Sequence, residues 1–160
     1  KSPFFFDMNL RFKVENILSD VFDENPSLFL IELKIGPDNS IHIILDGDRE
    51  VSLLDCMNIS RSVESNLDRE EEDFSLEVSS AGVGIPLKNQ RQYIKNIGRK
   101  LKVEIANETI VEGILTSVNE KNFTLNWKKR EAKTIGKGKV TVEKQQTLLY
   151  ENVVNSKVII

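Results

Sequence analysis

Apolar residues in the first part of the chain recur first at helical spacing and then at strand spacing. From Asn9 they lie three and four positions apart, which predicts a helix that ends before Pro26. Two runs rich in apolar and branched residues follow, at 28–35 and 41–45. The Gly-Pro-Asp-Asn-Ser segment between them favours a turn, so the two runs predict a β-hairpin.

A second helix and a third strand are predicted after the hairpin. Ser52, with Asp55 three residues later, resembles a capping box that opens a helix running to about Leu67. From Phe74 to Ser79, apolar and polar residues alternate as in a strand with one buried face. The order helix, strand, strand, helix, strand predicts a two-layer α/β unit with both helices on one sheet face. The expected inward face of the second helix consists of Leu53, Cys56, Met57, Ser60, Val63 and Leu67.

The second half of the chain is predicted to consist mostly of strands. A short basic helix is expected over 88–97, with Tyr93, Ile94 and Ile97 facing inward. Gly113 lies in the middle of a later strand, where a missing side chain permits a sharp bend. Several short strands with such a bend predict a small closed β-barrel of SH3-like or Sm-like kind. The expected strands are 101–105, 110–118, 123–127, 139–142 and 148–160.

The segment 76–87, Leu-Glu-Val-Ser-Ser-Ala-Gly-Val-Gly-Ile-Pro-Leu, separates the two halves. Its strand pattern stops where two glycines permit positive φ and Pro86 lacks a backbone donor, so the chain leaves the sheet here. The predicted fold class is α+β, with two domains and a joint between them. Their expected boundaries are 9–80 for the α/β domain, 81–87 for the joint and 88–160 for the barrel.

The charge of the chain changes sign at this joint. Residues 1–87 carry 7 Lys and Arg against 18 Asp and Glu, a net charge of −11, whereas residues 88–160 carry 15 against 7, a net charge of +8. Each half therefore projects its own sign of electrostatic potential. This asymmetry predicts two binding surfaces with opposite preferences.

Composition narrows the class of protein. The chain is 39% hydrophobic and 29% charged, as in ordinary soluble domains, and no apolar run approaches the ~20 residues that span a bilayer. Cys56 is the only cysteine, which excludes an intramolecular disulfide and a cysteine zinc cage and is consistent with a reducing, cytoplasmic setting. Met8 is a candidate initiator, in which case residues 1–7 are leader sequence.

Few residues offer catalytic or metal chemistry. A nucleophilic Cys56 would need a general base, and the only histidine, His42, lies on a predicted strand, so a small core residue is the favoured interpretation. Asp46, Asp48 and Glu50 lack the full spacing of a calcium loop and are better interpreted as solvated carboxylates. The sequence contains no Walker phosphate loop, HExxH motif or serine-centred elbow. We therefore expect a non-enzymatic protein that uses no cofactor or metal.

A basic segment after the only tryptophan is the main candidate binding site. The segment 128–138 is predicted to be a long loop or a splayed hairpin. Its cations can neutralise phosphates while the tryptophan stacks on a base, although a solvated loop beside a core tryptophan is an equally good interpretation. The candidate RNA-binding residues are Trp127, Lys128, Lys129, Arg130, Lys133, Lys137 and Lys139.

An acidic run before the third strand is the second candidate surface. Such a run suits a basic protein partner because complementary charge speeds encounter, although acidic loops also serve solubility. Paired with a basic second half, it predicts an assembly that contains both RNA and basic proteins, such as the ribosome. The candidate residues for contact with a ribosomal protein are Asp46, Asp48, Asp68, Glu70, Glu71, Glu72 and Asp73.

The segment 76–87 resembles the joint of the bacterial ribosome maturation factor family RimP, whose usual form is Leu-Glu-Val-Ser-Ser-Pro-Gly-Leu-Asp-Arg-Pro-Leu. Ala81, Gly84 and Ile85 depart from this form and remove a potential ion pair, so we expect a looser joint. The residues that match the motif are Glu77, Ser79, Ser80, Gly82, Pro86 and Leu87. Resemblance to the hairpin-to-helix region of the family extends over 44–46, 51–56, 60–61 and 67–68.

This resemblance implies a non-enzymatic assembly factor that binds the free small (30S) ribosomal subunit and assists its maturation. It also implies an α/β domain followed by an Sm-like or SH3-like barrel, and contact with a basic protein of the small subunit. The competing hypothesis is a general Sm-like RNA-binding module that is not committed to the ribosome. A stable ring would favour that module, whereas the assembly factor is expected to be a monomer without membrane contact.

Overall fold

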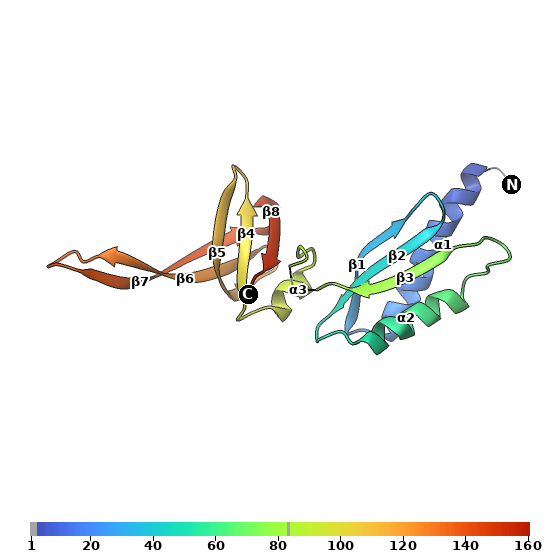
Figure 1. Cartoon of the computed structure of the whole chain (residues 1–160), viewed down its shortest axis with the longest axis horizontal. Coiled ribbons are helices and arrows are strands. Elements are labelled where there is room, and N and C mark those ends of the chain that lie inside the picture. Colours follow the sequence, from blue (N-terminus) through green and yellow to red (C-terminus); the bar gives the residue numbers. More distant parts are fainter. Residues whose placement is uncertain (1–2, 83) are drawn as a thin grey trace. The chain divides into compact units, whose positions relative to one another are not determined.

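The computed structural model describes residues 3–82 and 84–160, with side chains from residue 10 onward. Residues 1 and 2 of the predicted leader and residue 83 of the predicted joint lie outside the described residues. The chain divides into two compact units, Lys1–Ala81 and Gly82–Ile160 (Figure 1). Each unit has a hydrophobic core of its own.

The first unit has the predicted order of helix, strand, strand, helix and strand. Its elements are α1 (Pro3–Glu24), β1 (Leu28–Ile35), β2 (Ser40–Gly47), α2 (Leu53–Ser65) and β3 (Ser75–Ser80). The strands β1 and β2 form the expected antiparallel hairpin, and β3 pairs in parallel with β2, which gives the order β1-β2-β3. A parallel pair needs a long crossover, and α2 provides it (Figure 1).

One core joins both helices to a single face of this sheet. Ile41, Ile43 and Leu45 alternate along β2, so their side chains point to the same face, and all three are almost fully buried. They share one apolar cluster with both helices, which places the helices on that face as predicted. The helical side chains in the cluster include Leu10, Val14, Leu18 and Val21 of α1 and Cys56, Ile59 and Val63 of α2.

The inward face of α2 differs from the prediction. The helix begins at the expected capping box, in which the Ser52 hydroxyl accepts a hydrogen bond from Asp55 N at 3.1 Å. The prediction that Leu53 and Met57 face inward was wrong, since these side chains are 78% and 41% exposed. Ile59 is buried in the core, and this rotates the buried stripe of the helix away from Met57.

The second unit is built on a five-stranded antiparallel sheet with the order β7-β6-β5-β4-β8. Its elements are α3 (Gln90–Lys95), β4 (Lys100–Ile105), β5 (Thr109–Val118), β6 (Asn122–Ala132), β7 (Lys139–Leu149), the 3₁₀ turn η1 (Tyr150–Asn152) and β8 (Val153–Val158). A closed barrel was predicted. Among the described residues, however, β7 and β8 are not paired with each other, so the barrel is open. The turn η1 separates the two strands, and β8 pairs with β4 instead.

Strands β6 and β7 are longer than predicted. The first continues past 123–127 to Ala132, and the second runs without a break from 139–142 into the start of 148–160. Main-chain pairing of β6 with β7 continues beyond the apolar core. The side chains there are mostly charged, so the alternation of apolar and polar residues that predicts a strand is missing.

The short helix α3 buries polar side chains where apolar ones were predicted. Tyr93 faces inward as expected, but Ile94 and Ile97 are 52% and 47% exposed, and Gln92 and Asn96 are buried. The Gln92 side chain accepts hydrogen bonds from the backbone that precedes α3, and Asn96 Nδ2 donates to the Gln92 carbonyl at 2.7 Å. Because these polar groups are satisfied within the helix and its cap, their burial carries little cost.

Candidate nucleic-acid interface

The segment predicted to be a loop or splayed hairpin forms a paired hairpin arm. Since β6 continues to Ala132 and β7 begins at Lys139, five residue pairs follow Trp127 in register. The turn spans only 133–138 and is closed by a backbone hydrogen bond of 3.2 Å. We call residues 128–143 the arm; it extends from the sheet of the second unit by about 16 Å, at ~3.3 Å per residue (Figure 1).

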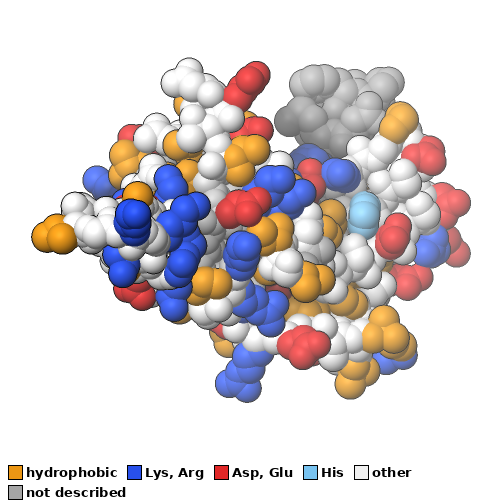
Figure 2. Space-filling view, turned by 60° about the vertical axis from the view of Figure 1, so that its left-hand side comes forward, with side chains coloured by type: hydrophobic (Ala, Val, Ile, Leu, Met, Phe, Trp, Pro, Cys, Tyr) orange, Lys and Arg blue, Asp and Glu red, His pale blue; other side chains and the backbone are white. Residues whose placement is uncertain are grey.

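One face of the arm is predominantly basic. Side chains that oppose each other in an antiparallel pair share a face, as do alternate residues along a strand. Lys128, Arg130 and Lys139 therefore lie on one face, which we call the basic face, together with Thr141 and Glu143. Arg130 Nη1 donates a hydrogen bond to Thr141 Oγ1 at 3.2 Å, which holds the guanidinium across the ribbon. Figure 2 shows Lys and Arg side chains gathered over this part of the second unit.

The opposite face of the arm contains Glu131, one of the two acids of the arm, in an ion pair. Lys144 Nζ lies 2.9 Å from Glu131 Oε1. The hydrogen bond and charge of Lys144, with a smaller contribution from Lys129, hold the pKa of Glu131 below its usual range. Val140 and Val142 share this face. Lys129 also lies on this face, which is thus less basic than the one that carries Lys128, Arg130 and Lys139, and Glu131 joins the two strands of the hairpin.

Trp127 lies at the base of the arm, where the apolar core ends. Its ring is partly buried against the cluster that contains Phe123 and Leu125. The pairs that follow it are mostly exposed. This position suits an anchor for the arm better than a free platform for a stacked base.

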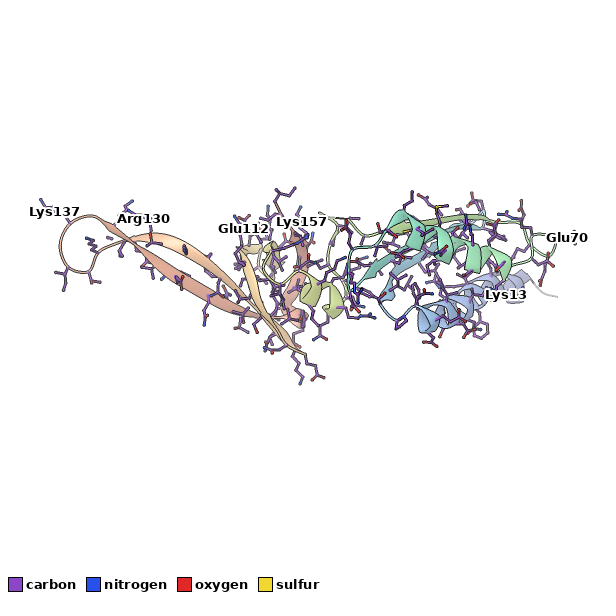
Figure 3. All side chains as sticks on the ribbon, turned by 90° about the horizontal axis from the view of Figure 1, so that it is seen from below. Lys13, Glu70, Glu112, Arg130, Lys137 and Lys157 are labelled. Atoms are coloured by element: carbon purple, nitrogen blue, oxygen red, sulfur yellow. The ribbon has the colours of Figure 1, made fainter. Side chains whose placement is uncertain are left out.

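The turn of the arm exposes two lysines and one isoleucine. Lys133 and Lys137 are exposed, and Figure 3 shows Lys137 at the far end of the hairpin. Ile135, between them, is 87% exposed. Gly136 and Gly138 adopt positive φ angles of 86° and 98°, which glycine tolerates without strain. Sequence reasoning missed Ile135 because one apolar residue in a charged turn produces no periodic pattern.

The acidic segment 68–73 of the first unit is tied to cations of its own unit. Arg69 forms ion pairs with Glu64 at 3.0 Å and Asp73 at 3.3 Å, and its guanidinium lies 4.1 Å from the centre of the Phe74 ring. Lys13 Nζ of α1 lies 2.8 Å from Glu71 Oε1. The segment is therefore ordered and partly neutralised within its own unit. The predicted residues Asp68, Glu70, Glu71 and Asp73 are exposed, and Glu72 is half-buried.

Asp46 does not belong to an exposed acidic surface. It is only 5% exposed, and its Oδ1 accepts a hydrogen bond from Gly47 N at 2.8 Å. Asp48 is exposed in the loop that follows β2. The sequence interpretation of a solvated loop thus fits Asp48 and fails for Asp46, because β2 continues through Gly47 and carries Asp46 inside the unit.

The residues of the joint motif occupy the end of β3 and the start of the second unit. Ser79 Oγ lies 3.0 Å from His42 Nε2 across the parallel pair β2 and β3. Leu87 N donates to the Ser156 carbonyl at 2.7 Å, which fixes the chain onto β8. Gly82 has open space where a Cβ would be. The remaining motif residues are Glu77 and Ser80 on β3 and Pro86 in the segment before α3.

Cys56 has the surroundings of a packing residue. It is 7% exposed in the core of the first unit, and burial, followed by the charge of Asp55, raises the pKa of its thiol. Within residues 10–82 and 84–160 no group of three or more His, Cys, Asp or Glu side chains is arranged to hold a metal ion. None of the helices described in the structure is both long and apolar enough to span a membrane.

Comparison with known proteins extends over both units. A family model described as the RimP N-terminal domain matches residues 17–84. The ribosome maturation factor RimP of Christiangramia forsetii is 54% identical over 149 residues, 93% of this chain and 97% of the relative. The protein of the same name from Flavobacterium psychrophilum is 51% identical over 153 residues, 96% of this chain and 99% of the relative. A third, from Porphyromonas gingivalis, is 37% identical over 108 residues, 68% of this chain and 70% of the relative.

Proposed function

Because this chain belongs to the RimP family of ribosome maturation factors, we propose that it assists assembly by binding the free small (30S) ribosomal subunit. A role in ribosome maturation follows from the family. The small subunit as the target, ribosomal RNA as a direct ligand, the absence of catalysis and a cytoplasmic location are our proposal.

The basic face of the arm is the observation that supports RNA binding. Lys128, Arg130 and Lys139 project from one face of a ribbon that extends beyond the core. A row of cations along a polyanion gains affinity by releasing the counterions condensed on the phosphates. The arm is therefore suited to lie along an RNA backbone, with the rest of the second unit as its support.

The acidic first unit supports a second contact of opposite charge. The net charge of −11 over residues 1–87 disfavours approach to RNA and favours a basic surface such as a ribosomal protein. The segment 68–73 is the proposed centre of that surface, since hydrogen bonds from Glu70 N and Glu72 N to Asp68 fold its backbone into a turn while most of its carboxylates stay exposed. Two contacts of opposite sign would orient the chain on a particle that offers both kinds of partner.

Removing the charges of the basic face tests the RNA contact. In the triple variant Lys128→Gln, Arg130→Gln and Lys139→Gln, binding to purified small subunits should weaken. The slope of log affinity against log salt concentration should flatten by about 0.7 to 0.9 for each phosphate that the variant no longer neutralises. Titration of labelled protein with small subunits over a range of salt concentrations measures both quantities.

A matched control removes three charges from the same unit outside the arm. Arg99, Lys100 and Lys121 are exposed, and their replacement by glutamine changes the net charge by the same amount. For this control variant, the slope of log affinity against log salt concentration should stay close to that of the unmodified chain. An equal reduction of slope in the two variants would mean that only net charge matters and would reject the arm as the RNA-binding element.

A further inference from the structure

We propose that Ile135, at the tip of the arm, contacts an unstacked base of RNA, while Lys133 and Lys137 contact the phosphates beside it. This inference rests on the proposed function and names what the tip of the arm recognises. The ligand is a base exposed at a bulge, an internal loop or the end of a helix.

The exposure of Ile135 is unusual for a large apolar side chain within a folded unit. It is 87% exposed, compared with 78% for Leu53 on α2, 65% for Val154 on β8 and 52% for Ile110 on β5; only the C-terminal Ile160 is more exposed among the described residues. It lies in the turn, beyond the five residue pairs that follow Trp127, the last side chain of β6 that packs on the core. Among the described residues, Ile135 does not belong to the apolar cluster of the second unit.

The backbone of the turn holds Ile135 at the extremity of the hairpin. The hydrogen bond from Lys133 N to the Gly138 carbonyl closes the turn, and the positive φ of Gly136 and Gly138 reverses the chain within a few residues. Its neighbours along the chain are Thr134 and the two lysines, and an exposure of 87% means that the described residues leave most of its side chain uncovered. Figure 3 shows Lys137 at this end of the hairpin, with Arg130 further back along the arm.

The neighbours of Ile135 favour a nucleic acid over a protein pocket. A protein-docking tip is expected to group apolar side chains, whereas residues 133–138 are otherwise lysine, threonine and glycine. Proteins that bind the minor groove of DNA combine cationic side chains with an apolar side chain, isoleucine among them, that enters a base step. The charge pattern of this tip matches that arrangement.

RNA structure determines where such a tip can bind. The major groove of an A-form helix is deep and narrow, and the bases of a continuous helix are stacked on each other. Bases become accessible at bulges, loops and helix ends, where an apolar side chain can cover the exposed face of a base. A contact made in this way tolerates different bases, so the tip would recognise an interruption of the helix more than a sequence.

The test compares Ile135→Ser with Val154→Ser in the full chain. The probes are a short RNA hairpin with a bulged 2-aminopurine, a fluorescent base that reports stacking, and the same hairpin fully paired. We expect Ile135→Ser to bind the bulged RNA about tenfold more weakly, with an unchanged salt slope, and to lose the fluorescence change. Val154→Ser, which removes an exposed apolar side chain outside the arm, should leave both readouts unchanged. Ile135→Leu should restore binding.

Two results would overturn the inference. If Ile135→Ser kept the affinity and fluorescence change of the unmodified chain, the tip would not contact a base. If it weakened binding to small subunits but not to the bulged RNA, the isoleucine would occupy a protein pocket instead. Neither result removes the proposed function, which requires binding to free small subunits and fails only if the unmodified chain does not bind them.

Discussion

A side chain at Gly113 would have no room against β6. A Cβ at this position would lie 2.8 Å from the carbonyl oxygen of Asn126 and 3.2 Å from the Cβ of Leu125. The nearest atom belongs to the backbone of a paired strand, so it cannot turn aside as a flexible side chain would. The sequence predicted that this glycine permits a bend. The structure shows that glycine is needed here because β5 and β6 approach each other closely.

We therefore predict that Gly113→Ala destabilises the second unit by about 1 to 3 kcal/mol. Trp127 is the only tryptophan and packs on the core of this unit, so its fluorescence during urea unfolding follows the relevant transition. Gly82→Ala is the control, because a Cβ there meets no heavy atom within 4 Å. Equal midpoints for the Gly113→Ala variant and the unmodified chain would show that β5 and β6 separate easily.

Burial of single residues was the feature that sequence reasoning predicted least well. Charge suggests exposure, yet Asp46 is 5% exposed because it precedes the last residue of a central strand. Helical spacing suggests burial, yet Leu53 is 78% exposed in the first turn of α2. Both outcomes depend on where the neighbouring elements end, which local spacing does not contain.

At the scale of elements, helices and strands that pack on a core were predictable, whereas for the arm the sequence left a long loop and a splayed hairpin as alternatives. The hairpin of β1 and β2, the capping box of α2 and the glycine in β5 all leave a local mark in the sequence. The arm leaves none, because main-chain hydrogen bonds and side-chain pairs between its own strands hold it together. The six cations after Trp127 were predicted as a site, but their division between the basic face, the opposite face and the turn required the register of the hairpin.

We predict that Glu131→Gln loosens the arm. The ion pair of Glu131 with Lys144 joins the two strands, so its removal should speed amide hydrogen exchange in the arm and leave β4 and β5 unchanged. Glu112→Gln removes an exposed acid from β5, outside the arm, and serves as the control. If the amide hydrogens of the arm exchanged at the same rate in both variants, backbone pairing alone would hold the hairpin together.

Acid should have the same effect as this substitution. The pKa of Glu131 is lowered in the folded chain, so the carboxylate contributes stability above the usual glutamate pKa of about 4.3. That contribution is lost as the pH falls through the lowered pKa. The difference in exchange between Glu131→Gln and the unmodified chain, measured in parallel at each pH, should therefore vanish in acid.

At the scale of the whole molecule, the change in the sign of the net charge between the two halves of the chain could be predicted from the sequence alone. The charge of −11 before Lys88 and +8 from it onward predicted two kinds of partner, and the motif over 76–87 indicated the family. Family membership is shown by relatives at 54% and 51% identity over nearly the whole chain. What the sequence did not contain was the form of the basic surface, a projecting ribbon with an apolar tip.

The central claim is that this chain binds the free small subunit selectively, and co-sedimentation tests it most directly. Purified protein is mixed with free small subunits, free large subunits and joined ribosomes from one extract, at two salt concentrations. We predict co-migration with free small subunits that persists at the higher salt, because an RNA contact and a protein contact act together. Equal binding to all three particles that disappears at higher salt would contradict the claim and leave a basic domain with a general affinity for RNA.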